Sequence, residues 1–340
     1  MSENIVLPFQ HRQSAHCESG VAANMLTNQG IATSEAMAFG IGAGLFFTYL
    51  PFIRLNKLPL VSYRAAAGHL LKTFARIPGF TLQQQTYSSR EEAMAELDRM
   101  LGLGIPAGLQ TGVYWLPYFP KALRFHFNAH NLVVYGREGN EYLISDPVFP
   151  EPVRCTAVDL TRARFASGAL APRGKMYYFS KVSQEYDRKK AILDGIDNVS
   201  RMMVKVRFPL IGVRGIRFLA GRLRHWPKKM DDQKADLHLG QVIRMQEEIG
   251  TGGGGFRFMY AAFLQECAQL MGEDSLSEQA ERLILAGDSW REFAAMAARI
   301  CKKREKAGEN YEAAANLLLH CADLEEQIFT GLNTWLKAQP

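Results

Sequence analysis

The sequence lacks several features that would place it in a common class of protein. Its 340 residues include only five cysteines, with no C-x-x-C pair and one cysteine left over by arithmetic. This scarcity argues against a disulfide framework and against a cysteine zinc site, and we expect no bound metal. The first residues, MSENIVLPF, have neither the basic segment nor the apolar core of a secretion signal. We therefore expect the protein in the reducing cytoplasm.

Long hydrophobic runs are also missing. The most apolar stretch, FGIGAGLFFTYLPFI at 39–53, is too short and too rich in glycine to cross a bilayer as a helix. We expect it to be a buried helix or loop, which either packs in the core or walls an acyl-chain tunnel. The hydrophobic content of 47% is nevertheless sufficient for a folded chain with well-packed cores.

Acidic residues are absent from 200–229, SRMMVKVRFPLIGVRGIRFLAGRLRHWPKK, although lysine and arginine recur throughout it. Such a segment is either a contact surface or a solvated face. Aromatic side chains for base stacking are sparse there, which argues against nucleic acid as the partner. Its apolar residues leave contact with a membrane surface open.

The periodicity of the chain predicts an α+β protein of two domains. A mixed domain at 1–182 precedes a helical domain at 183–340, which is interrupted by the glycine-rich GTGGGGF. Within the first domain we expect helices at 17–30, from 34 onward, at 64–76 and at 91–101. We expect strands at 5–9, at 105–115, on both sides of a turn at 137–140, and at 175–180.

Cys17 is the first candidate for chemistry. It lies in QSAHCESGVAANML at 13–26, where small and apolar residues at helical spacing predict that a helix begins. A helix N-terminus and a nearby imidazole lower the pKa of a thiol and so supply the reactive thiolate. The alternative is that Cys17 is simply a small buried residue of a core helix.

Two histidines of RFHFNAHNLVVYG, His126 and His130, are candidates for the imidazole. His130 directly precedes a predicted strand, and the returning strand YLISDP carries Asp146 back to the same end of the hairpin. The position opposite His130 falls at 147 or 148, so Asp146 is expected to orient the ring. A shift of one residue in register would instead put the two side chains on opposite faces.

Two stretches carry a resemblance to a known family. HCESGVAANMLTNQGIATSEAMAFGIGAGLFFTY resembles the N-terminal domain of the butirosin biosynthesis protein H (BtrH) family. IGTGGGGFRFMYAAFLQECAQL resembles the helical domain of unassigned function that accompanies it. The resemblance implies a papain-like catalytic domain, with Cys17 as nucleophile, His130 as base and Asp146 as orienting acid.

The resemblance also implies an acyltransferase. The acyl group would come from the phosphopantetheine thioester of an acyl carrier protein, with no other cofactor bound, and pass to an amine or hydroxyl of a small-molecule or lipid acceptor. Papain-like enzymes carry a glutamine about six residues before the cysteine to help hold the oxyanion, but His11 occupies that position here. The backbone N–H of Cys17 is one expected donor to the oxyanion. Gln10, the residue before His11, is a candidate for the second donor.

Further candidates belong to substrate binding. Glu35, after Ser34, is either a helix-capping carboxylate or an anionic contact for an acceptor amine. Gly252, Gly253 and Gly254 offer backbone N–H groups to a phosphate or pantetheine, although no phosphate-loop lysine follows. Two alternatives to the acyltransferase stay open: a cysteine peptidase or amidase, and a non-enzymatic basic protein that binds nucleic acid or a membrane.

Overall fold

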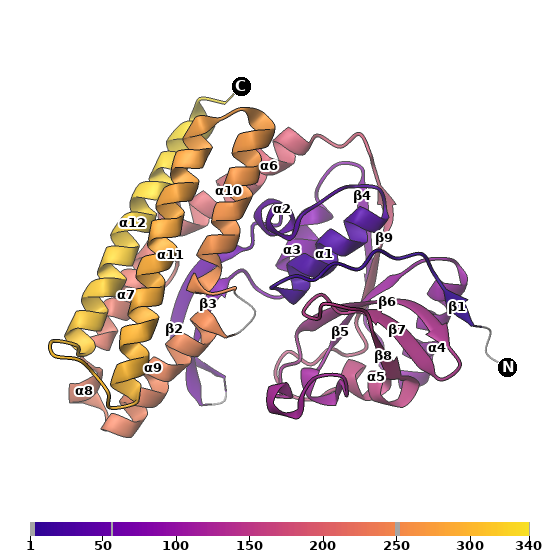
Figure 1. The fold of residues 1–340 in the computed structure, drawn as a ribbon, viewed down its shortest axis with the longest axis horizontal. Helices are drawn as coiled ribbons and strands as arrows, with labels where there is room; N and C mark the ends of the chain where they lie inside the picture. Colours follow the sequence, from indigo (N-terminus) through magenta and orange to yellow (C-terminus); the bar gives the residue numbers. More distant parts are fainter. Residues whose placement is uncertain (1–3, 56, 249–251, 340) are drawn as a thin grey trace. The chain divides into compact units, whose positions relative to one another are not determined.

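The chain divides into two compact units in the computed structural model, which describes residues 4–55, 57–248 and 252–339 (Figure 1). The first unit comprises 1–38 and 70–187, and the second comprises 39–69 and 188–340. This division differs from a single cut at 182, because 39–69 belongs with the helical part of the chain.

A seven-stranded antiparallel sheet forms the frame of the described part of the first unit. Its main path is β4 (Phe80–Gln85), β9 (Met176–Val182), β5 (Ala107–Thr111), β6 (His130–Glu138), β7 (Glu141–Ser145) and β8 (Val153–Thr156), and β1 (Ile5–Val6) also pairs with β6. Of these strands, β4 and β8 are additions to those expected from the sequence.

Helices cover both faces of this sheet (Figure 1). α1 (Cys17–Asn28) packs against β6 on one side, and α4 (Arg90–Gly102) and α5 (Ala157–Arg164) pack on the other. Leu132 and Val134, two apart on β6, share one buried cluster with residues of α4 and α5. The period of two along the strand therefore separates the α4–α5 face from the α1 face.

The β6–β7 hairpin determines where the expected site forms. Glu138 pairs with Glu141, so the turn contains only Gly139 and Asn140, and Gly139 has a φ of 57°, which glycine adopts without strain. The register continues to Val133, opposite Ser145, across an irregularity in β6. The strands thus bring the start of β6 beside the residues that follow β7.

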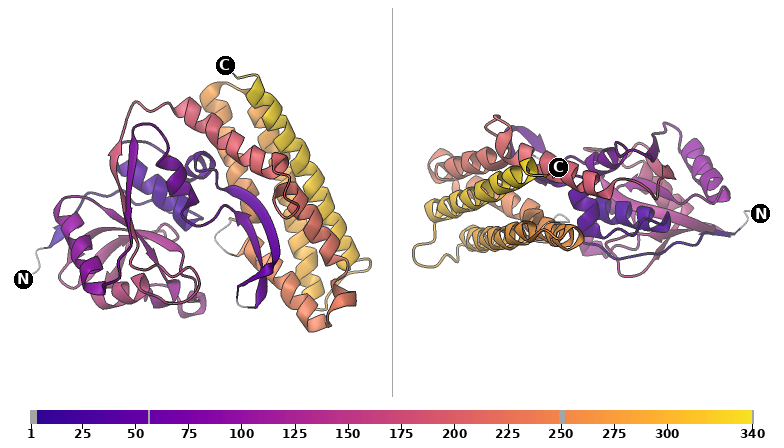
Figure 2. Two further views of the ribbon diagram at one scale, coloured as in Figure 1. Left: turned by 180° about the vertical axis from the view of Figure 1, so that it is seen from behind. Right: turned by 90° about the horizontal axis from the view of Figure 1, so that it is seen from above.

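The second unit is built from helices around one hairpin (Figure 2). Its helices are α6 (Arg188–Ser200), α7 (Gly212–Leu223), α8 (Trp226–Lys229), α9 (Asp232–Glu247), α10 (Arg257–Met271), α11 (Asp274–Cys301) and α12 (Tyr311–Lys337). The hairpin strands β2 (Leu45–Leu55) and β3 (Leu58–Arg64) pack against α7 and α9, respectively. Its core holds an ion pair between Arg257 and Glu325, at 2.7 Å, with both side chains fully buried.

The predictions for two segments of the chain are wrong. The run at 39–53 is not a buried helix or loop, because it supplies the end of α2 (Glu35–Ile41) and most of β2. The expected helix at 64–76 is reduced to α3 (His69–Phe74), since β3 extends to Arg64. An apolar run reads alike as buried strand or buried helix, and here pairing of β2 with β3 decides the outcome.

The first part of the apolar run, through Tyr49, packs in the core. Phe39 stacks on Phe256 at 5.0 Å between ring centroids, and Phe47 lies edge-on to Tyr63 at 5.3 Å. All four rings are almost completely buried. None of the helices within the described ranges is both long and apolar enough to cross a membrane.

Candidate active site

Cys17 is the first residue of α1 and is 7% exposed. His16 caps the helix: its Nδ1 accepts a hydrogen bond from the backbone N–H of Ser19 at 3.3 Å. The unpaired N–H groups and the dipole at a helix N-terminus favour negative charge, so this position favours a thiolate at Cys17.

Glu35 supports the chain just before Cys17. Its carboxylate accepts the backbone N–H groups of Ala15 at 2.8 Å and His16 at 2.7 Å, and the hydroxyl of Ser19 at 3.1 Å. Burial raises the pKa of Glu35, and the hydrogen bonds from Ala15, His16 and Ser19 oppose that rise. Glu35 therefore neither caps its own helix nor presents a free carboxylate, and the capping oxygen of α2 is Ser34 Oγ.

The side chains of His130 and Asp146 lie in contact, as the predicted hairpin requires. His130 Nε2 lies 2.7 Å from Asp146 Oδ2, and both side chains are at least 95% buried. Tyr118 donates its hydroxyl proton to the same Oδ2 at 2.8 Å, and the Val148 N–H lies 3.3 Å from Oδ1. Phe119 stands edge-on to the imidazole at 5.4 Å, so an aromatic side chain helps to exclude water from the pair.

Cys17 completes this group through a hydrogen bond to the His130 side chain. Since Nε2 is engaged by Asp146, Nδ1 is the ring nitrogen left for the thiol. Burial alone lowers the pKa of His130, but the Asp146 charge and hydrogen bonds to Asp146 and Cys17 outweigh it and raise that pKa to about 10. The imidazolium in turn favours the Cys17 thiolate.

The other cysteines have no such activation. Burial raises the pKa of the Cys155 thiol to about 12 and that of Cys301 to about 11, and it also raises the pKa of Cys267 and Cys321. None of the five cysteines, all of which lie in the described ranges, forms a disulfide bond. Cys17 is therefore the cysteine whose surroundings favour the charged form.

Asn131 belongs to the site although the sequence did not single it out. Its Nδ2 lies 3.9 Å from Cys17 Sγ, and its Oδ1 accepts the hydroxyl of Tyr177 at 2.8 Å. The side-chain amide is thus held with its nitrogen toward the sulfur. The signal in the sequence was a single amide between His130 and the apolar run LVV, and such a signal is weak on its own.

Two expected residues lie elsewhere in this unit. The backbone N–H of Gln10 bonds to the side chain of Asn28, the last residue of α1, at 2.7 Å. At 1.5 Å per residue, α1 separates Asn28 from Cys17 by roughly 16 Å, so Gln10 is not an oxyanion donor. His126 is exposed and stacks on Tyr114 at 4.3 Å, which leaves His130 as the imidazole beside Asp146.

The three glycines belong to the second unit and do not form an open phosphate cradle. Gly252, Gly253 and Gly254 all have positive φ values, but the Gly254 N–H donates to Glu247 Oε1 at 3.1 Å. A carboxylate at this loop repels a phosphate. The preceding Thr251 lies outside the described residues.

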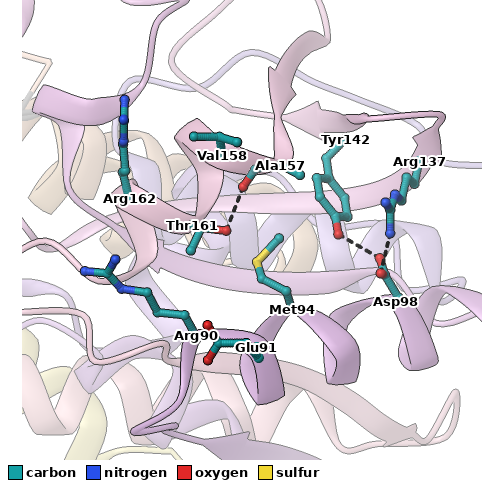
Figure 3. Close-up of a pocket in the computed structure, with 10 residues that line it drawn as sticks. All are labelled: Arg90, Glu91, Met94, Asp98, Arg137, Tyr142, Ala157, Val158, Thr161 and Arg162. Carbon is teal, nitrogen blue, oxygen red and sulfur yellow. Dashed lines mark hydrogen bonds and ion pairs between the residues drawn. The ribbon is translucent and has the colours of Figure 1, made fainter.

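A hollow of about 520 Å³ lies between α4 and α5, apart from the Cys17 group (Figure 3). Figure 3 shows a polar cluster at one end, where Arg137 and Tyr142 both reach Asp98. Its lining residues are Arg90, Glu91, Met94, Asp98, Arg137, Tyr142, Ala157, Val158, Thr161 and Arg162. Over the described ranges, no three His, Cys, Asp or Glu side chains gather as a metal site.

Comparison with known proteins confirms the family resemblance. Residues 16–147 match the model of the N-terminal domain of butirosin biosynthesis protein H, and residues 158–332 match that of a domain of unknown function, DUF4872. No curated protein sequence matches the chain. Among solved structures it is similar to a protein from Bacillus anthracis described as a C39-like peptidase, at 16% identity and a TM-score of 0.36, over 54% of this chain and 100% of that one. Because the DUF4872 model spans more than half of the chain, the protein belongs to the DUF4872 family and carries an N-terminal part of the butirosin biosynthesis protein H type.

Proposed function

We propose that the protein is a cysteine acyltransferase that takes an acyl group from an acyl carrier protein thioester and delivers it to an amine or hydroxyl acceptor. The observation that carries the proposal is the Cys17–His130–Asp146 group, in which the imidazole bonds both to the nucleophile and to a buried carboxylate. The match to the butirosin biosynthesis protein H model over 16–147 supports the choice of acyl transfer.

The first half-reaction forms an acyl-enzyme. The Cys17 thiolate attacks the thioester carbonyl carbon, and the resulting oxyanion is held by the Cys17 backbone N–H and the Asn131 amide. The bond from that carbon to the pantetheine sulfur then breaks. The departing sulfur takes the proton of the His130 imidazolium and leaves as a thiol.

The second half-reaction uses His130 as a base. Neutral His130 accepts a proton from the acceptor amine or hydroxyl as that group attacks the acyl carbon. The bond to Cys17 breaks, and sulfur leaves as the thiolate, which restores the ion pair with the imidazolium. Asp146 keeps the ring oriented and stabilises its charged form in both steps.

Intact-mass measurement tests this proposal. The full chain is incubated with acyl N-acetylcysteamine thioesters of several chain lengths, and separately with the same acyl groups on a carrier protein. We expect one acyl mass on the wild type and none on Cys17→Ala. Acylation of Cys17→Ala would refute the assignment of the nucleophile.

The same acyl-enzyme separates transferase from hydrolase. The acylated protein is offered water alone, then a panel of primary amines and alcohols, and release of the acyl group is followed. Acceptor-dependent release with formation of the amide or ester supports transfer. Release in water at the same rate, with free acid as the product, would instead identify a hydrolase, as the peptidase or amidase alternative requires.

A further inference from the structure

The β2–β3 hairpin of the second unit ends in large apolar side chains that face solvent. Phe52 is 67% exposed, Ile53 41% and Leu55 38%, whereas Phe47 and Tyr49 earlier in β2 are buried. The same strand thus passes from the core to the surface. Clustered exposed apolar side chains on a folded protein mark a contact surface, because isolated ones are common but clusters are not.

Cations accompany these apolar residues. Arg54 and Lys57 lie in the hairpin tip itself, which we define as Phe52, Ile53, Arg54, Leu55 and Lys57. Close by, α8 contributes Lys228 and Lys229, and α9 contributes Lys234. None of these five cations forms an ion pair with any of the residues that the structure describes.

The tip and the α8–α9 corner form one surface. Trp226 of α8 packs edge-on against His238 of α9 at 5.5 Å. The pKa of His238 is lowered by burial and further by the charges of Lys234 and Arg54, so Arg54 lies close to α9. Figure 2 shows the end of the hairpin beside the start of this helix.

A shallow hollow of about 390 Å³ continues this surface. Leu58 of β3 and Leu237 of α9 both line it, and Leu237 is 55% exposed. The acidic residues nearby are Asp231, Asp232 and Asp236. Asp231 caps α9 by accepting the Lys234 N–H at 2.8 Å, and Asp236, which lines the hollow, pairs with Lys303 at 2.9 Å. Cations therefore prevail around the exposed apolar side chains.

We propose that this surface docks on an anionic lipid membrane. Apolar side chains at the end of a hairpin enter the interface between headgroups and acyl chains, while lysine and arginine around them pair with lipid phosphates. Ile53 and Leu55 offer no stacking face, which disfavours single-stranded nucleic acid. A protein partner would need a pocket for Phe52, whereas a bilayer accepts it without one.

Vesicle co-sedimentation of the full chain tests the proposal. We expect binding to vesicles of phosphatidylcholine with phosphatidylglycerol, little binding to phosphatidylcholine alone, and weaker binding as salt is raised. Phe52→Ser with Ile53→Ser should reduce binding at least tenfold. Arg54→Gln with Lys57→Gln should remove most of the dependence on phosphatidylglycerol. Leu285→Ser on α11, where Leu285 is 60% exposed, is the matched control and should bind as the wild type does.

Three results would overturn the proposal. The first is that the wild type does not bind anionic vesicles. The second is that the wild type and the variant with Phe52→Ser and Ile53→Ser bind these vesicles equally well. The third is that these substitutions abolish self-association, or association with an acidic carrier protein, while vesicle binding persists. Vesicle binding is measured without any reaction at Cys17, so its failure is separate from failure of the proposed acyl transfer.

Discussion

The Glu35 carboxylate accepts the backbone N–H of His16 at 2.7 Å, one residue before Cys17. It thereby ties the start of α1 to the start of α2. Substitution of Glu35 removes a positioning contact without touching the nucleophile, and small displacements of a reacting group are costly in rate.

We expect Glu35→Ala to lower kcat/KM for a small thioester by about 10- to 100-fold while the protein stays folded. Alkylation of Cys17 by iodoacetamide should slow in parallel, because the helix start no longer holds the sulfur in place. Glu92→Gln on the exposed face of α4 is the control. Unchanged kinetics and alkylation in Glu35→Ala would show that the contact only stabilises the loop.

The charge of His130 predicts a pH dependence of stability. Its pKa in the folded protein, about 10, lies above the ordinary 6.5, so the folded state binds this proton more tightly than the unfolded state does. Its stabilising contribution is complete below about pH 6.5 and is lost as pH rises through 10.

Urea unfolding at several pH values between 6 and 10.5 measures this effect. The difference in unfolding free energy between the wild type and His130→Gln should shrink as pH rises across that range. A difference that stays constant with pH would mean that His130 is neutral in the folded protein.

Substitutions of Asp146 and of Tyr118, which contacts it, should lower turnover to different extents. Asp146→Asn removes the charge that favours the imidazolium and should lower turnover by more than tenfold. Tyr118→Phe removes one hydrogen bond to Oδ2 but leaves the carboxylate, so its effect should be smaller. His130→Ala should cost about as much turnover as Cys17→Ala. A larger loss in Tyr118→Phe than in Asp146→Asn would contradict this division of roles.

Carrier proteins are typically acidic, so the basic stretch at 200–229 is the surface on which we expect one to dock, and docking should depend on only part of that stretch. Arg217 and Arg224 are paired with α12 through Asp323, Glu326 and Glu312, whereas Arg214 and Arg222 are exposed without ion pairs to described residues. Arg214→Glu with Arg222→Glu should therefore raise the KM for an acylated carrier protein, and so should added salt.

The matched measurement uses a small thioester, whose KM should stay nearly constant in the same variant. If both substrates are affected equally, the two arginines do not act through carrier docking.

Stability of the second unit should depend on the buried Arg257–Glu325 pair. Glu325→Ala leaves a buried guanidinium without its partner and should destabilise the protein by about 3–5 kcal/mol. Arg257→Met with Glu325→Leu should cost much less, because no charge remains buried. Thermal unfolding of the three proteins distinguishes these outcomes, and equal losses in both variants would argue that packing rather than charge dominates.

The sequence by itself determined the parts of the site that depend on short-range order. Small and apolar residues at helical spacing placed Cys17 at a helix start, and the compact turn after Glu138 made β6 and β7 neighbours. Since a short hairpin admits few registers, His130 and Asp146 could be predicted to lie together. The family resemblance followed from the same residues.

Tertiary structure alone decided the rest. Asn131 reaches Cys17 across 114 residues of sequence, and Glu35 reaches back to His16, because packing of α1 on β6 and of α2 beside it brings these side chains together. The run at 39–53 carried no period that separates strand from helix, so its pairing with β3 and its packing on α7 made it a strand. Local propensity is worth fractions of a kcal/mol per residue, and burial against distant elements outweighs it.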